Sequence, residues 1–361
     1  MISVHREDRR EGAAMTLGPL LAGAGALLAV WVLTRLVIVV GSRRRWLEPF
    51  SERGSHNVPT LSRGGIGFVC VLSIALPVSL SSLLGWVGAC TVVVAGLVVA
   101  LVGYIDDARP LPVLPRILTH GLAVLVSLVV LWPFIESFAE RQPNLSVWLL
   151  GAGGALAWLW SINFFNFMDG IDGIAASEVA FIGATASMIC LSTGSEGLVV
   201  TWALLAGAAM GFLVWNAPPA RIFMGDVGSG YLGFVVGGLL LISVLQAAIP
   251  PLVALLLVAA FLIDATVTLL RRMTRGERWY LSHRQHAFQH LTTRWGSHGR
   301  VTGAYTLFNL LVIAPTIAVI YRAPSLAVPM TVAVVACGTA LVWAAGAGQP
   351  PRANRSRGEG V

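Results

Sequence analysis

The stretch WVGACTVVVAGLVVALVGYIDDAR, residues 86–109, decides the class of fold. Its first twenty residues carry no charge. A helix of about 20 apolar residues is long enough to cross the ~30 Å hydrocarbon core of a bilayer. The run ends in Asp106, Asp107 and Arg109. An apolar run that stops at paired acids predicts a membrane-spanning helix with a functional polar group at its end.

Similar apolar runs recur along the whole chain. Hydrophobic residues make up 56% of the 361 residues and charged residues only 11%, whereas soluble domains average about 25% charged residues. We therefore predict an all-α, polytopic transmembrane bundle of about eleven helices, forming one membrane domain over residues 1–345. The expected spans are 17–40, 66–83, 86–104, 114–132, 146–165, 175–191, 197–215, 229–248, 250–270, 303–321 and 326–345. The polar tail, 346–361, is expected to be disordered.

The arginines predict the orientation of the chain. The sequence has no lysine, and 18 of its 24 arginines lie in the breaks on one side of the expected bundle. Basic residues collect on the cytoplasmic side of membrane proteins, so we expect the N-terminus outside and the C-terminus in the cytoplasm. The net charge of +7 does not indicate nucleic-acid binding, because the arginines are spread between apolar spans.

The aspartates are placed even more unevenly. Six of the seven lie at or near the predicted cytoplasmic ends of helices: Asp106, Asp107, Asp169, Asp172, Asp226 and Asp264. Ionisable groups at membrane depth are costly and are functional candidates by default. Six acids from separate segments on one face indicate a single converging anionic site.

The first acidic motif is the pair Asp106–Asp107. It follows a helix C-terminus, where the partial negative charge of the helix disfavours acids. The pair therefore needs a compensating cation. Either it forms a salt bridge to Arg109 or Arg116, or it handles Mg²⁺ or a substrate.

A second motif, residues 223–230, reads FMGDVGSG. Three glycines around Asp226 let the backbone approach a ligand closely. Carboxylate oxygen suits Mg²⁺, which usually takes one or two carboxylates plus substrate phosphates. The plainer alternative is a turn in which Asp226 caps the following helix.

Between these two motifs lies NFFNFMDGIDG, residues 163–173. Asn163, Asn166, Asp169 and Asp172 alternate there with apolar residues. Capping of the helix near 175 could account for Asp172 but not for the other three. Amides beside acids favour recognition of a hydrogen-bonding ligand at the membrane surface.

The longest predicted cytoplasmic loop contains His283, Arg284, His286 and His290. Zinc binding is one reading, but no cysteine or carboxylate lies beside the histidines, and the third is seven residues from the first. A solvated basic helix is another reading. We favour binding of a diphosphate.

Taken in order, these motifs resemble the polyprenyl-phosphate N-acetylhexosamine-1-phosphate transferase superfamily, glycosyltransferase family 4. The likeness covers roughly residues 43–310, and the ending RWGSH after the histidine loop is similar to the bacterial branch that starts O-antigen and related glycans. The resemblance implies that Asp226 binds magnesium and that Phe223 stacks on uracil. It implies the rest of the site as well: Asp106, Asp107, Asp169 and Asp172 in catalysis, and Asn163, Asn166, His283, Arg284 and His286 in substrate binding.

The resemblance also implies a reaction. The family transfers a sugar phosphate from a UDP-N-acetyl sugar to a polyprenyl (undecaprenyl) phosphate and releases UMP. Mg²⁺ is the expected cofactor, with Mn²⁺ as an alternative. The expected partners are the donor, the lipid acceptor and the bilayer, with no nucleic acid; a homodimer is left open. The expected location is the bacterial inner membrane, with the site facing the cytoplasm.

The first predicted cytoplasmic loop departs from the family pattern. Where the family usually shows PTPRGGG, residues 59–65 read PTLSRGG. His56 stands where one member of the family, the translocase that makes the first lipid intermediate of peptidoglycan, has an upstream lysine. The role of Arg63 is therefore open.

Two other classes of function compete with this interpretation. A CDP-alcohol phosphotransferase fits the start of DGIDGIAA, but Ser177 stands where that signature needs arginine. A transporter would carry ionisable groups near the bilayer midplane within repeated halves, and no repeat is visible here. UMP release in the presence of polyprenyl phosphate would separate the transferase from both.

Overall fold

The computed structural model describes residues 4–46, 60–142, 144–278, 280–281 and 283–350. Within them the chain is helical, as predicted, and the only β-like pairing is an isolated bridge between Leu61 and Ile222. The elements in chain order are α1 (Val4–Arg44), α2 (Ile66–Ala108), α3 (Val113–Glu140), α4 (Val147–Met168), α5 (Ile174–Ser192), α6 (Glu196–Asn216), α7 (Asp226–Leu245), α8 (Pro251–Leu257), α9 (Ala259–Thr274), α10 (Ala287–Trp295), α11 (His298–Phe308), the π-helix η1 (Asn309–Ile313), α12 (Ala314–Arg322), the 3₁₀ helix η2 (Pro324–Leu326) and α13 (Ala327–Ala345).

Nine helices in the described ranges are long and apolar enough to cross a membrane, or ten when the bent pair α8–α9 is taken as one span. The predicted number was eleven. The difference from ten arises because α2 contains two of the predicted spans, 66–83 and 86–104. Gly85 interrupts α2 with φ +67° and ψ 163°, far from helical values. Ser73 Oγ lies 3.0 Å from the Tyr231 hydroxyl, and a Cβ on Gly96 would lie 3.2 Å from the ring of Tyr231. The two halves of α2 therefore fold back on each other at Gly85.

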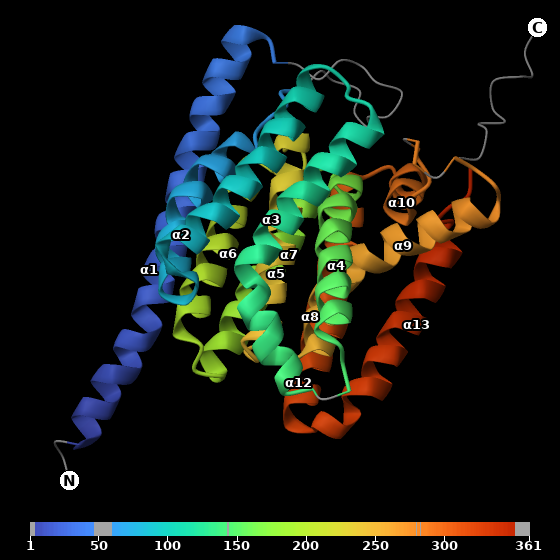
Figure 1. The fold of residues 1–361 in the computed structure, drawn as a ribbon. Coiled ribbons are helices and arrows are strands. Elements are labelled where there is room, and N and C mark those ends of the chain that lie inside the picture. Colours follow the sequence, from blue (N-terminus) through green and yellow to red (C-terminus); the bar gives the residue numbers. More distant parts are fainter. Residues whose placement is uncertain (1–3, 47–59, 143, 279, 282, 351–361) are drawn as a thin grey trace, which may run out of the picture.

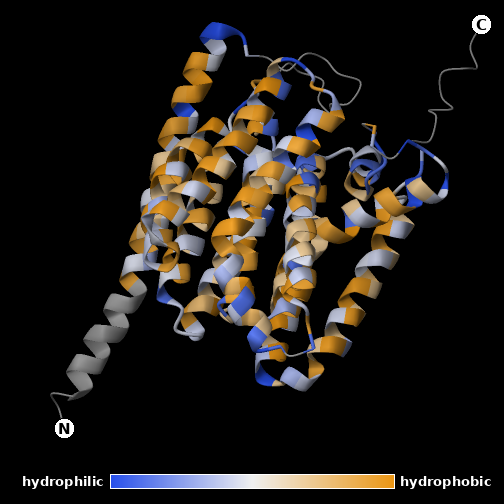
Figure 2. Ribbon diagram, in the orientation of Figure 1, coloured by the Kyte–Doolittle hydropathy of each residue, from blue (hydrophilic) through white to orange (hydrophobic). Residues whose placement is uncertain are grey.

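The long sides of the bundle are apolar. Large side chains there are exposed, such as Ile74 at 76%, Val87 at 82% and Val129 at 75%. Figure 2 shows hydrophobic residues along the helices and hydrophilic residues gathered mainly at the two ends. Such sides fit a bilayer rather than water. The described chain starts at one end of the bundle with α1 and finishes α13 at the other (Figure 1). The N-out, C-in orientation stays a prediction.

Helix α7 is the most deeply buried of the spans and packs against α2 and α4. Ser161 Oγ of α4 donates a hydrogen bond of 2.8 Å to the Gly233 carbonyl of α7. Near its end, α2 approaches the start of α7 so closely that a Cβ on Gly103 would lie 2.3 Å from the Asp226 carbonyl oxygen. Only glycine permits this approach. It brings the acids at the end of α2 to the acid at the start of α7.

One predicted span is broken. The sequence predicted a single helix over 250–270, but α8 and α9 meet at Val258 with a bend of 77°. Beyond the bend, α9 runs sideways out of the bundle, with α10 beside it and the end of α13 close by (Figure 1). The bend carries Asp264 toward the start of α10.

Candidate active site

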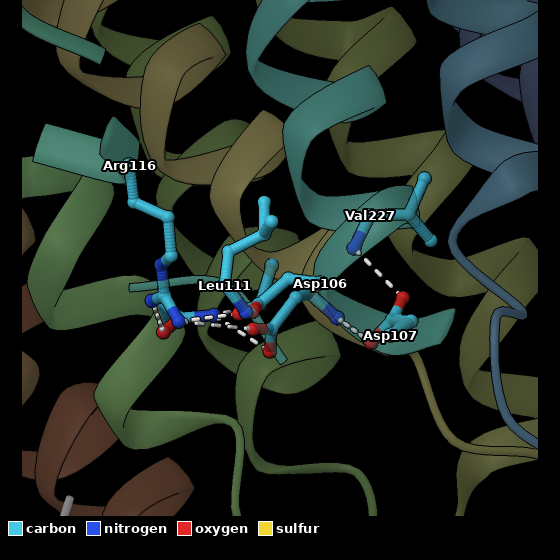
Figure 3. A network of polar contacts seen from close by, with 8 residues as sticks. Asp106, Asp107, Leu111, Arg116 and Val227 are labelled. Atoms are coloured by element: carbon cyan, nitrogen blue, oxygen red, sulfur yellow. Dashed lines mark hydrogen bonds and ion pairs between the residues drawn. The ribbon is translucent and has the colours of Figure 1, made fainter. Parts of the chain in front are cut away.

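Arg116, near the start of α3, joins polar groups from α2, α4 and α7, and Figure 3 shows it beside Asp106. Its Nη1 donates to Asp106 Oδ2 at the end of α2 and lies 3.8 Å from Asp226 Oδ2 at the start of α7. Its Nη2 donates to Asn166 Oδ1 of α4 at 3.3 Å. Asn166 Nδ2 in turn donates to Asp226 Oδ1 at 2.9 Å and to Ser229 Oγ at 3.1 Å. We call Asp106, Arg116, Asn166 and Asp226 the arginine cluster.

The arginine cluster carries an excess of negative charge, because two carboxylates share one guanidinium. The Asp106 side chain is 9% exposed and also accepts a hydrogen bond of 2.6 Å from the Leu111 amide. The Asp226 side chain is 36% exposed and is the open member. The sequence left Arg109 or Arg116 as the partner of the acidic pair. In the structure the partner of Asp106 is Arg116, whereas Arg109 is exposed.

Asp107 turns the other way from Asp106 and meets the start of α7. Its Oδ1 accepts a hydrogen bond from the Asp226 amide at 2.8 Å, and its Oδ2 accepts one from the Val227 amide at 3.1 Å. A carboxylate at a helix N-terminus satisfies free amides and interacts favourably with the helix dipole. Asp107 is therefore the cap of α7, although it lies 119 residues before that helix.

Replacing Asp107 by alanine should weaken the fold around Asp226. Loss of a capping side chain costs ~0.5–2 kcal/mol of stability, so the melting temperature in detergent should fall measurably. Asp107→Asn keeps one acceptor oxygen and should lose less. Glu140→Ala, which removes a carboxylate from the exposed end of α3, is the matched control. An Asp107→Ala protein that melts with the wild type would contradict the capping role.

The segment 60–65, whose role the sequence left open, packs against 222–224. The Phe223 amide donates to the Leu61 carbonyl at 2.7 Å, and the Gly64 amide donates to the Phe223 carbonyl at 2.8 Å. Arg63 Nη2 donates to the Asp107 carbonyl at 3.2 Å, and its guanidinium lies 4.9 Å from the Tyr104 ring centroid. Arg63 thus contacts two residues at the end of α2, Tyr104 and Asp107, and stabilises that end. His56 lies outside the described residues.

Asp172 belongs to a second group at the start of α11. Its Oδ2 accepts a hydrogen bond of 3.0 Å from the Ala220 amide, and its Oδ1 lies 3.3 Å from His298 Nδ1. Thr302 Oγ1 donates to the Asp172 carbonyl at 2.7 Å. The residue before α5 is Gly173, with left-handed backbone, and no side chain caps that helix. Asp172 therefore has contacts beyond α5, and capping of that helix is not its only role.

Asp264, whose role the sequence did not reveal, holds the start of α10. It is fully buried and accepts hydrogen bonds from the Ala287 amide at 2.9 Å and the Phe288 amide at 3.2 Å. The Tyr305 hydroxyl donates to it at 2.6 Å, and His286 Nδ1 lies 3.5 Å from it. Asp264 thus fixes His286, which is 3% exposed, at the N-terminus of α10.

His283, earlier in the same loop, stacks on His286. The ring centroids of His283 and His286 lie 4.9 Å apart. Burial, followed by the nearby charges of His286 and Arg272, lowers the pKa of His283 to about 3. His283 is therefore neutral at pH 7 and can offer an anionic ligand a hydrogen bond rather than a charge. Arg284 is half-buried beside it.

The segment 166–173 connects these groups. Asn166 bonds to the arginine cluster, the Phe167 ring lies 6.1 Å from that of His286, and Asp172 reaches α11. Asp169 is the C-cap residue that follows α4. Asn163, a predicted substrate-binding residue, donates to the Leu159 carbonyl of its own helix at 2.7 Å. Phe223 lies half-buried in the segment just before α7.

The structure also bears on the choice of metal. In the part of the chain that it describes, no three His, Cys, Asp or Glu side chains gather as a metal site. Mg²⁺ needs fewer protein ligands because it keeps waters and substrate phosphates. The partly exposed Asp226 carboxylate, beside Asp106 and in a cluster of net negative charge, is a donor set that fits Mg²⁺.

The fold and the site define a class of protein: a polytopic helical membrane protein with an acidic cluster at one end of the bundle, beside a loop that contains His283, Arg284 and His286. A model of the family described as "Glycosyl transferase family 4" matches residues 89–244, which contain the arginine cluster, Asp107, Asp169 and Asp172. The chain belongs to glycosyl transferase family 4.

Three relatives show how far the likeness extends, and each is named phospho-N-acetylmuramoyl-pentapeptide-transferase. The protein of Moorella thermoacetica is 32% identical over 227 residues, covering 56% of this chain and 67% of that protein. The protein of Leuconostoc mesenteroides is 29% identical over 189 residues, covering 48% and 59%. The protein of Mycobacterium tuberculosis is 37% identical over 132 residues, covering 32% and 35%. The chain thus matches about a third to two thirds of the length of these relatives.

Proposed function

We propose that this protein transfers an N-acetylhexosamine 1-phosphate from a UDP-sugar to polyprenyl phosphate, giving a polyprenyl-diphosphate-sugar and UMP. The observation that carries the proposal is the arginine cluster, in which Asp106, Asn166 and Asp226 from three helices meet Arg116 at one end of a membrane bundle. Family membership supports the same class of reaction. The proposed location is the bacterial inner membrane, with the site facing the cytoplasm.

The chemistry needs positioning and neutralisation of charge more than covalent catalysis. A phosphate monoester has a second pKa near ~6, so the acceptor is already largely dianionic at pH 7. Its oxygen attacks the sugar-bearing phosphorus in line, and the bond from that phosphorus to the oxygen of UMP breaks. Asp226, with Asp106 beside it, would hold Mg²⁺, which when bound would neutralise the diphosphate. Arg116 orients both carboxylates.

The histidine loop would hold the donor. His283 and His286 stack at the start of α10, and Arg284 lies between them in sequence. Arginine binds phosphate oxygens with two parallel hydrogen bonds, and neutral histidine can donate one more. Phe223, three residues before Asp226, is the proposed stacking partner for uracil.

Arg284→Lys should raise the apparent KM for the UDP-sugar about tenfold, because a lysine ammonium cannot reproduce the paired hydrogen bonds of the guanidinium. The KM for polyprenyl phosphate should change less. Steady-state kinetics with each substrate varied in turn measures both values. Arg300→Lys, at an exposed position on α11, is the matched control. Equal changes in the two KM values would argue against a donor site at Arg284.

The sugar is the open part of the proposal. UDP-N-acetylglucosamine is the first candidate, in keeping with the predicted O-antigen branch, while the names of the relatives make UDP-N-acetylmuramoyl-pentapeptide the second. Purified protein should be assayed with polyprenyl phosphate, Mg²⁺ and a panel of UDP-N-acetyl sugars. UMP release that depends on the lipid would support the proposal and identify the donor. No UMP from any donor, together with uptake of a solute into vesicles, would support the transporter instead.

A further inference from the structure

Residues Gly346–Gln349, just before the last described residue, Pro350, lie against the histidine loop. Helix α13 ends at Ala345, and Gly346 follows with left-handed backbone, φ +106°. The chain then turns along α9 and α10. Residues 346–349 were expected to belong to a disordered tail, but the structure shows them tied to three other segments. We call Gly346–Gln349 the C-terminal strap.

Two arginines of α9 bind the strap through its carbonyl groups. Arg271 Nη1 donates to the Ala347 carbonyl at 2.5 Å, and Arg275 Nη1 donates to the Gly348 carbonyl at 2.5 Å. The Arg271 guanidinium also lies 3.7 Å from the ring centroid of Trp343 on α13, a close cation–π contact. Arg271 is only 9% exposed and Ala347 is fully buried, so the hydrogen bond between them is shielded from water, whereas Arg275 is exposed.

The strap reaches the histidine loop directly. The Gly348 amide donates to the Gln285 carbonyl at 2.6 Å, and His290 Nε2 lies 3.1 Å from the Gln349 carbonyl. Gln285 stands between Arg284 and His286 in sequence. Its side chain donates to Glu277 at 3.1 Å. The loop is therefore held from two sides, by Asp264 at the start of α10 and by the strap at Gln285.

We infer that the C-terminal strap positions the histidine loop for binding of the donor diphosphate. This inference rests on the proposed function, since it assigns the loop to a UDP-sugar. A loop that binds phosphate through one arginine and two histidines loses affinity when it must first be ordered. The strap orders the loop through Arg271, Arg275 and Gln285 before the ligand binds, so that binding does not include the entropic cost of ordering it. Its residues are positioning residues and do not touch the substrate in this scheme.

Gly348 is the position that tests the strap most directly. Its φ is +69°, and a Cβ there would lie 2.6 Å from Arg271 Cβ and 3.1 Å from the Thr268 carbonyl oxygen. Gly348→Ala should therefore push the strap off α9. Arg271→Met is a second variant that removes the bond to Ala347, and Arg271→Lys should recover part of the effect. Arg294→Met removes an equal charge from an exposed position on α10 and is the control.

Two measurements decide the question. Hydrogen exchange of the peptide containing residues 283–290 should quicken about tenfold in Gly348→Ala and Arg271→Met, the factor expected for loss of a well-made hydrogen bond, and should not change in Arg294→Met. The KM for UDP-N-acetylglucosamine, or for the donor that the panel identifies, should rise by a similar factor, with kcat and the KM for polyprenyl phosphate nearly unchanged.

Unchanged exchange in both strap variants would overturn the inference, and so would quickened exchange with an unchanged donor KM. The exchange measurement needs no activity. If the wild type released no UMP from any donor, the proposed function would fail, while exchange alone would still report whether the strap holds the loop.

Discussion

Asp226→Asn should lower the rate of UMP release on the order of a hundredfold or more, because loss of a magnesium ligand removes several kcal/mol of charge stabilisation from the transition state. Asparagine has the shape of aspartate and keeps an oxygen that can accept the hydrogen bond from Asn166 Nδ2, 2.9 Å long in the wild type. The variant therefore removes one charge and little else.

The measurement is UMP release at saturating donor and acceptor over a titration of Mg²⁺, with melting in detergent to show that the variant is folded. A rise in the Mg²⁺ concentration needed for half-maximal rate would identify Asp226 as a ligand. Glu196→Gln removes a carboxylate from the exposed start of α6 and should leave the rate unchanged. Near-normal turnover of Asp226→Asn at ordinary Mg²⁺ would remove Asp226 from the metal site.

The apolar runs predicted the helical membrane architecture because each run depends on local composition. A run of about 20 apolar residues usually forms a membrane-spanning helix. Every predicted span has a counterpart in the structure, and the two differences have local causes. Gly85 lies between two runs that the structure joins as α2, and the 77° bend after α8 divides another. A bend of that kind depends on packing and leaves little trace in composition.

The site was predictable as a set of residues but not as a set of roles. In the sequence, Asp106 and Asp107 are one acidic pair. In the structure, Asp106 pairs with Arg116, whereas Asp107 accepts hydrogen bonds from the backbone amides at the start of α7. Adjacent residues at a helix end point about 100° apart, so a pair in sequence divides between two partners. No signal near residue 107 could show that its partner follows 119 residues later.

The contacts of α11 were missed although a signal was present. His298, Thr302 and Tyr305 recur with helical spacing and contact Asp172 and Asp264. The spacing predicts one polar face on an otherwise apolar helix, and polar groups on such a face seek partners within a membrane bundle. The strap at 346–349 gave no such signal. Its bonds use backbone groups, which every sequence has.

Arg116→Met should lower kcat/KM on the order of a hundredfold, comparable to removing one donor from a preorganised site that stabilises a developing charge. Arg116 is the only group seen to contact Asp106, Asn166 and Asp226 together in the described part of the chain. Without it, two carboxylates would face an anionic donor and an anionic acceptor with one positive charge fewer, and Asn166 would lose the donor to its Oδ1.

The variants at Arg116 can separate charge from geometry. Arg116→Lys keeps the charge but cannot reach Asp106 and Asn166 at once, so it should recover only part of the rate. Arg109→Met removes the neighbouring exposed charge and should leave the rate close to that of the wild type. If Arg116→Met and Arg109→Met had equal and small effects, Arg116 would be a structural tie between α2 and α3 and not the centre of the site. A loss confined to Arg116→Met, with melting unchanged, would show that the guanidinium serves the reaction.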